Sequence, residues 1–190
     1  MNRAHAILRA TAVLLLVALC GCSSLRPTDF TAAVPRFEPE KFFEGPVRSW
    51  GVIETRSGRP QSRVRADLNG RREGNEIVIT QDFTFEDGRQ EQRVWRIKRV
   101  DEHRYEATAN GVIGPATGYA YGNSFHWVYT LQLRPGNVLT RVRMEHWMYL
   151  LGDERTVLNR VIIRKLGVVV AQTTEYFQKG TPTLPTTEAR

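Results

Sequence analysis

Two cysteines near the start of the chain are the residues whose chemistry is most clearly indicated. Cys22 ends the segment Leu19-Cys20-Gly21-Cys22. This segment matches the bacterial lipobox, in which an aliphatic residue and two tolerant positions ending in Gly or Ala precede the cysteine that receives a lipid. Cys20 fits less well, because Leu19 would occupy a position that requires a small residue. The sequence therefore predicts cleavage after Gly21 and lipidation of Cys22.

The residues before Cys22 have the composition of a signal peptide. Residues 1–21 contain two arginines, no acidic residue and an apolar run over residues 10–19, which is about half of the ~20 residues that span a bilayer. The alternative is an ordinary secretory signal that happens to contain two cysteines. Because Ser23 rather than Asp follows the cysteine, the usual sorting rule predicts a lipid-anchored protein of the Gram-negative outer membrane that faces the periplasm. Several attached acyl chains together give stable anchoring.

Residue patterns of common enzyme classes are missing from the sequence. It contains no G-x-S-x-G elbow, no H-E-x-x-H motif, no glycine-rich phosphate loop and no Cys/His cluster with metal-ligand spacing. The mature chain retains His103, His126 and His146, and Asp153-Glu154 falls in an expected turn. We therefore expect no enzymatic activity, no cofactor and no metal.

A candidate ligand site consists of polar and aromatic residues that strand alternation places inside the fold. A buried guanidinium such as that of Arg93 must be paired, because its desolvation costs several kcal/mol. Its partner is either Glu91 on the same face or the acidic head of an amphipathic ligand. In a strict meander, the turns at Asp101 and Pro135 lie at one end of the barrel. Arg93 and His146 would then lie at similar heights near the other mouth, although a hydrogen-bonded core residue is the favoured reading of His146. The candidate ligand-binding residues are Arg93, Gln81, Trp95, Trp127 and His146.

Strand signals at short, regular spacing fill residues 41–178, with one helical turn expected near residues 39–43. The pattern predicts an all-β fold, an antiparallel up-and-down meander that closes into a lipocalin-like β-barrel of about 8–10 strands. A sandwich is the alternative, but no long Greek-key connection is evident. The inside face of the last two strands stays unassigned. Strands are expected over residues 47–55, 62–69, 77–85, 89–97, 103–110, 125–133, 138–146, 157–166 and 168–177.

Two hairpins allow the strand pairing to be predicted. The apolar pattern selects a three-residue loop over residues 86–88, with Gly88 in the left-handed position. A second turn at Pro135-Gly136 gives one nearly apolar face on both strands and places Trp147 outside, where it can pack on the N-terminal segment or on a partner. The expected inward pairs are Gln81 with Arg93, Ile79 with Trp95, Trp127 with Met144, and Phe125 with His146.

Composition and charge give the domain organisation. We expect a signal peptide (1–21), a lipidated extended tether (22–40), a barrel domain (41–178) and a disordered tail (179–190). Removal of the signal leaves 169 residues with 25 basic and 20 acidic side chains, and Cys22 as the single thiol cannot form an intrachain disulfide. In an envelope location, this positive balance favours an anionic lipid surface over nucleic acid as a partner. The alternative, which is the favoured one, is that these arginines are ordinary solvated positions on the strands.

Short motifs in a fixed order resemble the family of bacterial lipoproteins called domain of unknown function 3833, over roughly residues 41–178. The resemblance implies a proteobacterial lipoprotein domain with no assigned activity, and the occurrence of members near fatty-acyl-modifying enzymes points to a lipid-related role. The family usually has an acidic pair where this chain has Glu145-His146, so no role of the second acidic position transfers to His146. The motifs are Phe42-Phe43-Glu44-Gly45, Trp50-Gly51, Gly74-Asn75, Asp87-Gly88, Arg93-Val94-Trp95, Gly122-Asn123 with Trp127 and Tyr129, Trp147-Met148-Tyr149-Leu150, and Asn159-Arg160.

These features predict a barrel that binds a hydrophobic or amphipathic ligand, an acyl lipid. The alternative is a structural or adaptor lipoprotein with a filled barrel that acts through its outer surface. A cavity of a few hundred Å³, the size of typical small-molecule sites, would distinguish the two.

Replacement of Cys22 tests the predicted anchor. Because the thiol of Cys22 is the expected acceptor of lipid, Cys22→Ala should accumulate as an unprocessed or membrane-released form in fractionated cells. A Cys22→Ala protein that is processed normally and stays firmly bound to membranes would contradict the prediction.

Overall fold

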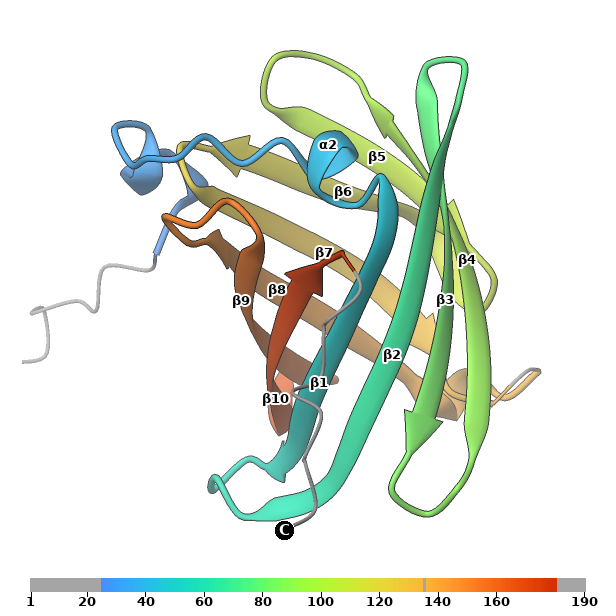
Figure 1. Ribbon diagram of the computed structural model, residues 1–190. Helices are drawn as coiled ribbons and strands as arrows, with labels where there is room; N and C mark the ends of the chain where they lie inside the picture. The colour runs from blue at the N-terminus through green and yellow to red at the C-terminus, as the bar shows by residue number, and fades with distance from the viewer. Residues whose placement is uncertain (1–24, 135, 181–190) are drawn as a thin grey trace, which may run out of the picture.

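The computed structural model describes residues 25–134 and 136–180, which form one closed antiparallel barrel of ten strands (Figure 1). Each strand pairs with its neighbours in the sequence, and β1 pairs with β10, so the predicted up-and-down barrel is confirmed and the sandwich is wrong. The predicted signal peptide, Cys22 and residues 181–190 lie outside the described residues. The strands are β1 (Gly45–Thr55), β2 (Pro60–Glu73), β3 (Glu76–Phe85), β4 (Gln90–Arg99), β5 (Arg104–Ala109), β6 (Val112–Tyr121), β7 (Ser124–Gln132), β8 (Arg141–Leu150), β9 (Thr156–Lys165) and β10 (Val168–Lys179).

The two hairpins differ in how well the sequence predicted their register. The β3–β4 pairing is confirmed, with Gln81 opposite Arg93. The β7–β8 register is wrong by two residues, because Trp127 pairs with His146 rather than with Met144. The reason is a longer connection, in which the 3₁₀ turn η2 (Val138–Thr140) precedes β8. A shift of two keeps every side chain on its predicted face, since side chains alternate with a period of two.

Strand β6 was not predicted from the sequence. It contains Gly114 and Pro115, which normally interrupt strands, and the register with β7 shifts around them, as at a β-bulge. The extra strand reverses the direction of every later strand. The turns at Asp101 and Pro135 therefore belong to opposite ends of the barrel, and the prediction that they share one end is wrong.

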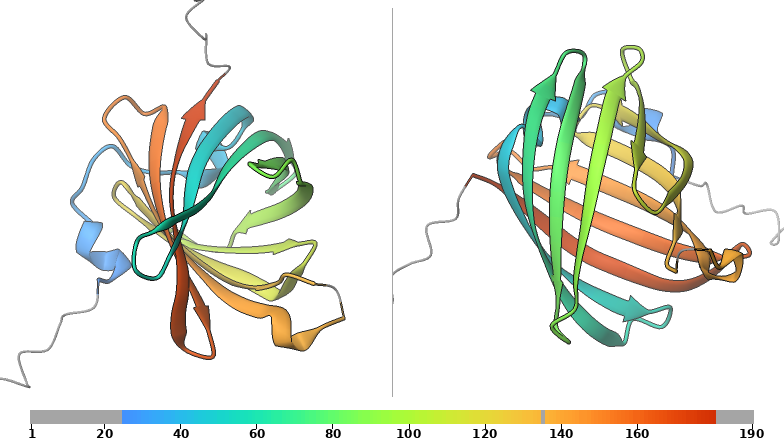
Figure 2. Two further views of the ribbon diagram at one scale, coloured as in Figure 1. Left: turned by 90° about the horizontal axis from the view of Figure 1, so that it is seen from below. Right: turned by 90° about the vertical axis from the view of Figure 1, so that its right-hand side faces the viewer.

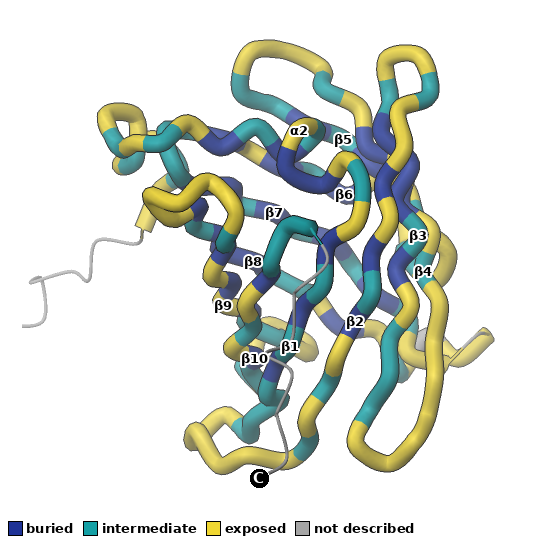
Figure 3. Tube along the Cα trace, viewed as in Figure 1, coloured by how far each residue is buried: buried dark blue, intermediate teal, exposed yellow. Residues whose placement is uncertain are grey.

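One end of the barrel is closed by aromatic side chains. The predicted helical turn is confirmed as α2 (Pro39–Phe42), which lies across this end (Figures 1 and 3). Phe42 packs edge-on against Phe37 with ring centroids 5.6 Å apart, and Phe43 packs edge-on against Phe177 at 5.7 Å. The buried core of the described residues extends from Phe37 to Phe177, which lies within residues 23–190.

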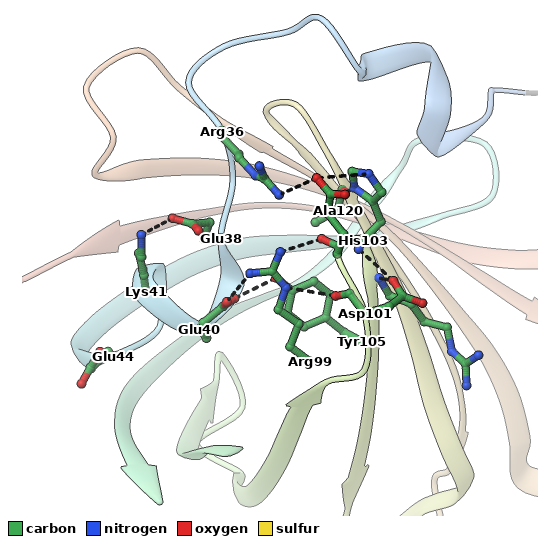
Figure 4. A network of polar contacts seen from close by, with 12 residues as sticks. Arg36, Glu38, Glu40, Lys41, Glu44, Arg99, Asp101, His103, Tyr105 and Ala120 are labelled. Carbon is green, nitrogen blue, oxygen red and sulfur yellow. Dashed lines mark hydrogen bonds and ion pairs between the residues drawn. The ribbon is translucent and has the colours of Figure 1, made fainter. Parts of the chain in front are cut away.

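A polar network fastens α2 to the sheet (Figure 4). The hydroxyl of Tyr105 donates a 2.8 Å hydrogen bond to Glu40 Oε2, and Arg99 Nη1 lies 3.4 Å from Glu40 Oε1. Arg99 also donates to the backbone oxygens of Asp101 and Glu102, at 3.0 and 2.7 Å. The helical turn is thereby bound to β4, β5 and the turn between them, so the closed end is one connected structure.

The described part of the expected tether packs on the barrel instead of extending freely. The ring of Phe30, in the 3₁₀ turn η1 (Pro27–Phe30), lies 6.1 Å from Trp147 and 5.5 Å from Tyr149. The Phe37 amide donates a 2.7 Å hydrogen bond to the Gly122 oxygen. The prediction that Trp147 could pack on the N-terminal segment is confirmed.

Small residues on β6 make room for large ones inside the barrel. Ala116, Gly118 and Ala120 are buried, and a Cβ at Gly118 would lie 2.3 Å from the Trp127 ring and 2.5 Å from the Phe125 ring. The barrel can therefore hold these two aromatic rings side by side only with no side chain at position 118.

No helix among the residues that the structure describes is long and apolar enough to span a membrane.

Gly70 provides a test of the closed end. A Cβ at this position would lie 1.9 Å from the Phe43 backbone oxygen, which cannot move without displacing α2. Gly70→Ala should lower the free energy of unfolding by about 1–3 kcal/mol, the usual cost of overpacking, as measured by urea denaturation. Gly152→Ala, where a Cβ meets no atom within 4 Å, is the control. Equal stability of the two variants would contradict this description of the closed end, which we call the cap and which consists of α2 and the aromatic rings packed around it.

Candidate functional site

The interior of the barrel contains a cavity of about 390 Å³. Its lining extends from Phe125 and Phe177 near α2 to Phe85, Arg89 and Leu133 beside the turns at the other end, which Figure 2 shows from below on the left. The cavity therefore reaches the end of the barrel opposite the cap. All five residues predicted as ligand-binding line it, namely Arg93, Gln81, Trp95, Trp127 and His146.

Arg93 enters the cavity from β4 with few partners. Its side chain is 12 % exposed, and its one ion pair with a described residue joins Nη2 to Glu91 Oε2 at 3.9 Å. Glu91 is shared, because it also pairs with Arg89. The Arg93 Nε is buried without a hydrogen-bond partner among the described residues, and the guanidinium carbon lies 5.3 Å from the Phe83 ring centroid. A largely buried cation with unused donors therefore faces the cavity.

An aromatic wall continues from Arg93 along the same strand. Trp95 Nε1 donates a 3.2 Å hydrogen bond to Gln81 Oε1, which orients the Gln81 amide. The Trp95 ring packs edge-on against Trp127 and Tyr129, with centroids 5.7 and 5.0 Å apart. This wall offers flat apolar surface beside a fixed amide.

The other two tryptophans do not contribute to the site. Trp50 stacks on Tyr176 with centroids 4.9 Å apart, on the outer side of β1 and β10, and Trp147 packs on Phe30. A ligand box of all four tryptophans, which composition alone would permit, is therefore absent from the described part of the chain.

His146 is a hydrogen-bonded interior residue, as its favoured reading predicts. Asn159 Nδ2 donates to His146 Nδ1 at 3.1 Å, so the ring proton is on Nε2, which donates to the Tyr129 hydroxyl oxygen at 3.1 Å. Burial lowers the pKa of His146 to about 3, so the ring is neutral. Burial also raises the pKa of Tyr129 to about 12. The Tyr129 hydroxyl proton is then left to donate to a molecule in the cavity.

Glu175 and Asn159 are site residues that the sequence did not reveal. Asn159 Nδ2 donates to Glu175 Oε2 at 3.0 Å, and Asn159 Oδ1 is buried without a hydrogen-bond partner among the described residues. Burial raises the pKa of Glu175 and outweighs the opposite effect of its polar neighbours, which favours the protonated acid. The signal was present, because Asn159 alternates with the apolar residues Val157 and Val161, but the faces of β9 and β10 were left unassigned.

The arrangement can hold an anion beside an apolar surface. One wall carries the Arg93 cation and the Gln81 amide, and the opposite wall carries the neutral His146 ring and the Tyr129 hydroxyl. The Glu175 carboxyl, whose pKa is raised by burial, also lines this wall. Among residues 25–134 and 136–180, no group of three or more His, Cys, Asp or Glu side chains is placed to hold a metal ion.

The buried histidine predicts a pH dependence of stability. The pKa of His146 is lower in the folded protein than its ordinary value of 6.5, so the unfolded chain binds more protons between pH 6.5 and about 3, and stability should fall as the pH is lowered through this range. Glu175 acts in the opposite sense, since its raised pKa removes stability as the pH rises above its ordinary value of 4.5. His146→Gln, measured by thermal unfolding from pH 7 to 4, should show a shallower loss of stability. An unchanged slope would contradict the assignment of a buried neutral ring.

Solved structures are similar to this chain at low sequence identity. The S-type phycobiliprotein lyase CPES from Guillardia theta has a TM-score of 0.55 and 9% identity, over 77% of this chain and 96% of that chain. A structure of EF1p2_mFAP2b bound to DFHBI gives a TM-score of 0.39 with 10% identity over 74% and 95% of the two chains. A de novo designed fluorescence-activating beta barrel gives 0.39 with 14% identity over 75% and 97%. At 9% identity, the likeness to the lyase establishes the fold alone.

Comparison with protein families bears out the resemblance seen in the sequence motifs. No curated protein matches the chain. One family model matches residues 16–179, which covers the cap and almost all of the barrel. The chain therefore belongs to the family described as protein of unknown function (DUF3833).

Proposed function

We propose that the barrel binds one amphipathic molecule, an acyl lipid, with its acidic head on Arg93 and its apolar body directed toward the cap. The observation that carries the proposal is the guanidinium of Arg93, largely buried beside a cavity and incompletely paired. Charge-assisted bonds from arginine to a carboxylate or phosphate are among the strongest hydrogen bonds in proteins. An anion at this position would supply the partner that Glu91 supplies only at 3.9 Å.

The shape and chemistry of the cavity support an apolar body for the ligand. Its volume of about 390 Å³ lies within the range of small-molecule sites. Arg93 lies near the start of β4, and therefore toward the open end, whereas the cavity continues inward toward Phe125 and Phe177. The apolar residues on the way include Ile79, Trp127, Met144, Met148 and Val161.

Neutral donors would complete the contacts to the acidic head. The Gln81 amide nitrogen makes no hydrogen bond with a described residue, and the Tyr129 hydroxyl proton lacks an acceptor among them. His146 uses both ring nitrogens within the protein, so its proposed role is to orient Tyr129 rather than to contact the ligand. Burial raises the pKa of Glu175, a shift toward the uncharged acid, which is the direction that suits an anionic guest.

The alternative of an adaptor with a filled barrel has less support. A filled barrel would pair Arg93 with Glu91 and leave no space beside them, whereas the cavity and the long 3.9 Å pair favour binding. The outer-membrane location and the lipid at Cys22 also belong to this proposal, and they rest on the signal sequence alone.

Replacement of Arg93 by methionine distinguishes a ligand-binding barrel from an adaptor with a filled barrel. Arg93→Met retains most of the apolar bulk and removes a charge-assisted contact that typically contributes ~1.5–3 kcal/mol. Fatty-acid affinity, measured by calorimetry or by displacement of a fluorescent fatty acid, should fall roughly 10- to 150-fold at about 1.4 kcal/mol per decade. Affinity for uncharged analogues such as the fatty alcohol should stay the same. Arg93→Lys should recover only part of the loss, because lysine lacks the planar fork.

Arg96→Met is the matched control, because Arg96 lies on the outer face of the same strand and is half exposed. This variant should bind fatty acids like the parent protein. Unchanged fatty-acid affinity in Arg93→Met would reject the proposed site, as would an equal loss for acid and alcohol.

A further inference from the structure

We propose that the open end of the barrel docks on an anionic lipid bilayer. The docking surface is formed by the β7–β8 loop, the β9–β10 turn and the strand ends beside them. These segments are neighbours, because β8 and β9 pair with Arg143 opposite Arg164. The inference goes beyond ligand binding, since it does not require that the cavity be occupied. We call this surface the rim.

Large apolar side chains are exposed at the rim. Leu166 is 97% exposed and Leu139 is 74% exposed, although soluble surfaces rarely gather such residues in one place. Leu133 and Val170 are exposed there too, and both also line the cavity. The apolar surface of the rim is thus continuous with the lining of the cavity. The exposed apolar residues of the rim are Leu133, Leu139, Leu166, Val168 and Val170.

Leu166 is held in a conformation that costs free energy. Its φ is 49°, in the left-handed region that leucine rarely adopts, and it is followed by Gly167 at the tip of the β9–β10 hairpin. Asn or Gly normally occupies this position in such tight turns. Because Leu166 packs on almost nothing in the folded domain, neither local backbone preference nor the core explains a leucine there. Insertion of its side chain into a bilayer would explain a leucine at this position.

Basic residues surround these apolar tips. Five cations lie on the rim, and one of them, Arg164, forms an ion pair with a described residue, Glu145 Oε2 at 3.7 Å. The closed end differs, because several of its arginines form ion pairs with neighbouring acids. The rim cations are Arg134, Arg141, Arg143, Arg164 and Lys165. The pairs at the closed end include Arg36–Glu102, Arg71–Glu73, Arg72–Glu44 and Arg99–Glu40.

Apolar tips among mostly unpaired cations match the interface of an anionic bilayer. Phosphate head groups would face the arginines, and Leu139 and Leu166 would enter the acyl boundary. Nucleic acid offers phosphate but no apolar surface for Leu166, and a second copy of the rim would bring like charges together. Docking would place the mouth of the cavity directly on the lipid. Because η1 lies at the closed end, beside Trp147 and Tyr149, the rim faces away from the predicted anchor at Cys22, so the bilayer on which the rim docks is a second one and not the bilayer that holds the anchor.

Vesicle sedimentation tests this surface. Residues 23–190 should bind phosphatidylcholine vesicles that contain phosphatidylglycerol, bind pure phosphatidylcholine vesicles much more weakly, and dissociate as salt is added. Leu166→Asn should weaken binding at least about tenfold, because it removes a buried leucine from the interface. Its unfolding midpoint should equal or exceed that of the parent, since asparagine tolerates the left-handed conformation. Arg134→Gln with Lys165→Gln should lose about fivefold per charge.

Leu151→Asn is the control, because Leu151 is exposed at the closed end. It should bind vesicles like the parent protein. Equal vesicle binding by Leu166→Asn and the parent, or binding indifferent to phosphatidylglycerol, would overturn the proposal. Self-association that Leu166→Asn abolishes, without vesicle binding, would assign the rim to a second copy and also overturn it. Failure of Arg93→Met to lose fatty-acid affinity would leave the docking result unaffected, so the two proposals can fail separately.

Discussion

The closure of ten strands into one barrel is the constraint on which the rest of the structure depends. About eight strands enclose an interior just wide enough for side chains to fill, and a wider barrel encloses more space. This chain fills one end with aromatic rings from α2, β7 and β10. It leaves the remaining space as a cavity of about 390 Å³ that reaches the other end. The two ends therefore have different surfaces, a cap secured by ion pairs and a mouth with exposed apolar and basic side chains.

Buried polar groups give the cavity its chemical character. On the side of β8–β10, Asn159 orders its neighbours by donating to both His146 and Glu175, and His146 in turn holds Tyr129. On the side of β4, Arg93 lacks such support. Because unpaired buried charge is costly, this asymmetry is more consistent with a site that receives an anion than with a core optimised for stability.

Local patterns in the sequence predicted the faces of the strands better than their order in space. The β3–β4 hairpin is correct in register, because the loop ending in Gly88 leaves little freedom. The β7–β8 register failed because η2 lengthens its loop, and β6 was missed because Gly114 and Pro115 resemble a break. That omission reversed the ends of the barrel. Arg93 and His146 nevertheless line the same cavity, because neither a register error of two residues nor a reversed strand direction moves a side chain to the other face of its strand. Glu175 and Asn159 lie opposite each other in the β9–β10 hairpin, and they could not be placed because polar and apolar residues are mixed on both faces of these two strands, so that their inside face was left unassigned.

Native mass spectrometry of residues 23–190, purified from cells without added lipid, can show directly whether the barrel binds an acidic amphiphile and whether Arg93 holds it. We expect a second mass species, heavier by one acidic amphiphile, in the parent protein and a much smaller fraction of it in Arg93→Met. Ligand-free protein alone, from cells that supply acyl lipids in excess, would contradict a lipid-binding barrel. A bound molecule retained equally by Arg93→Met would contradict the assignment of its head group to Arg93.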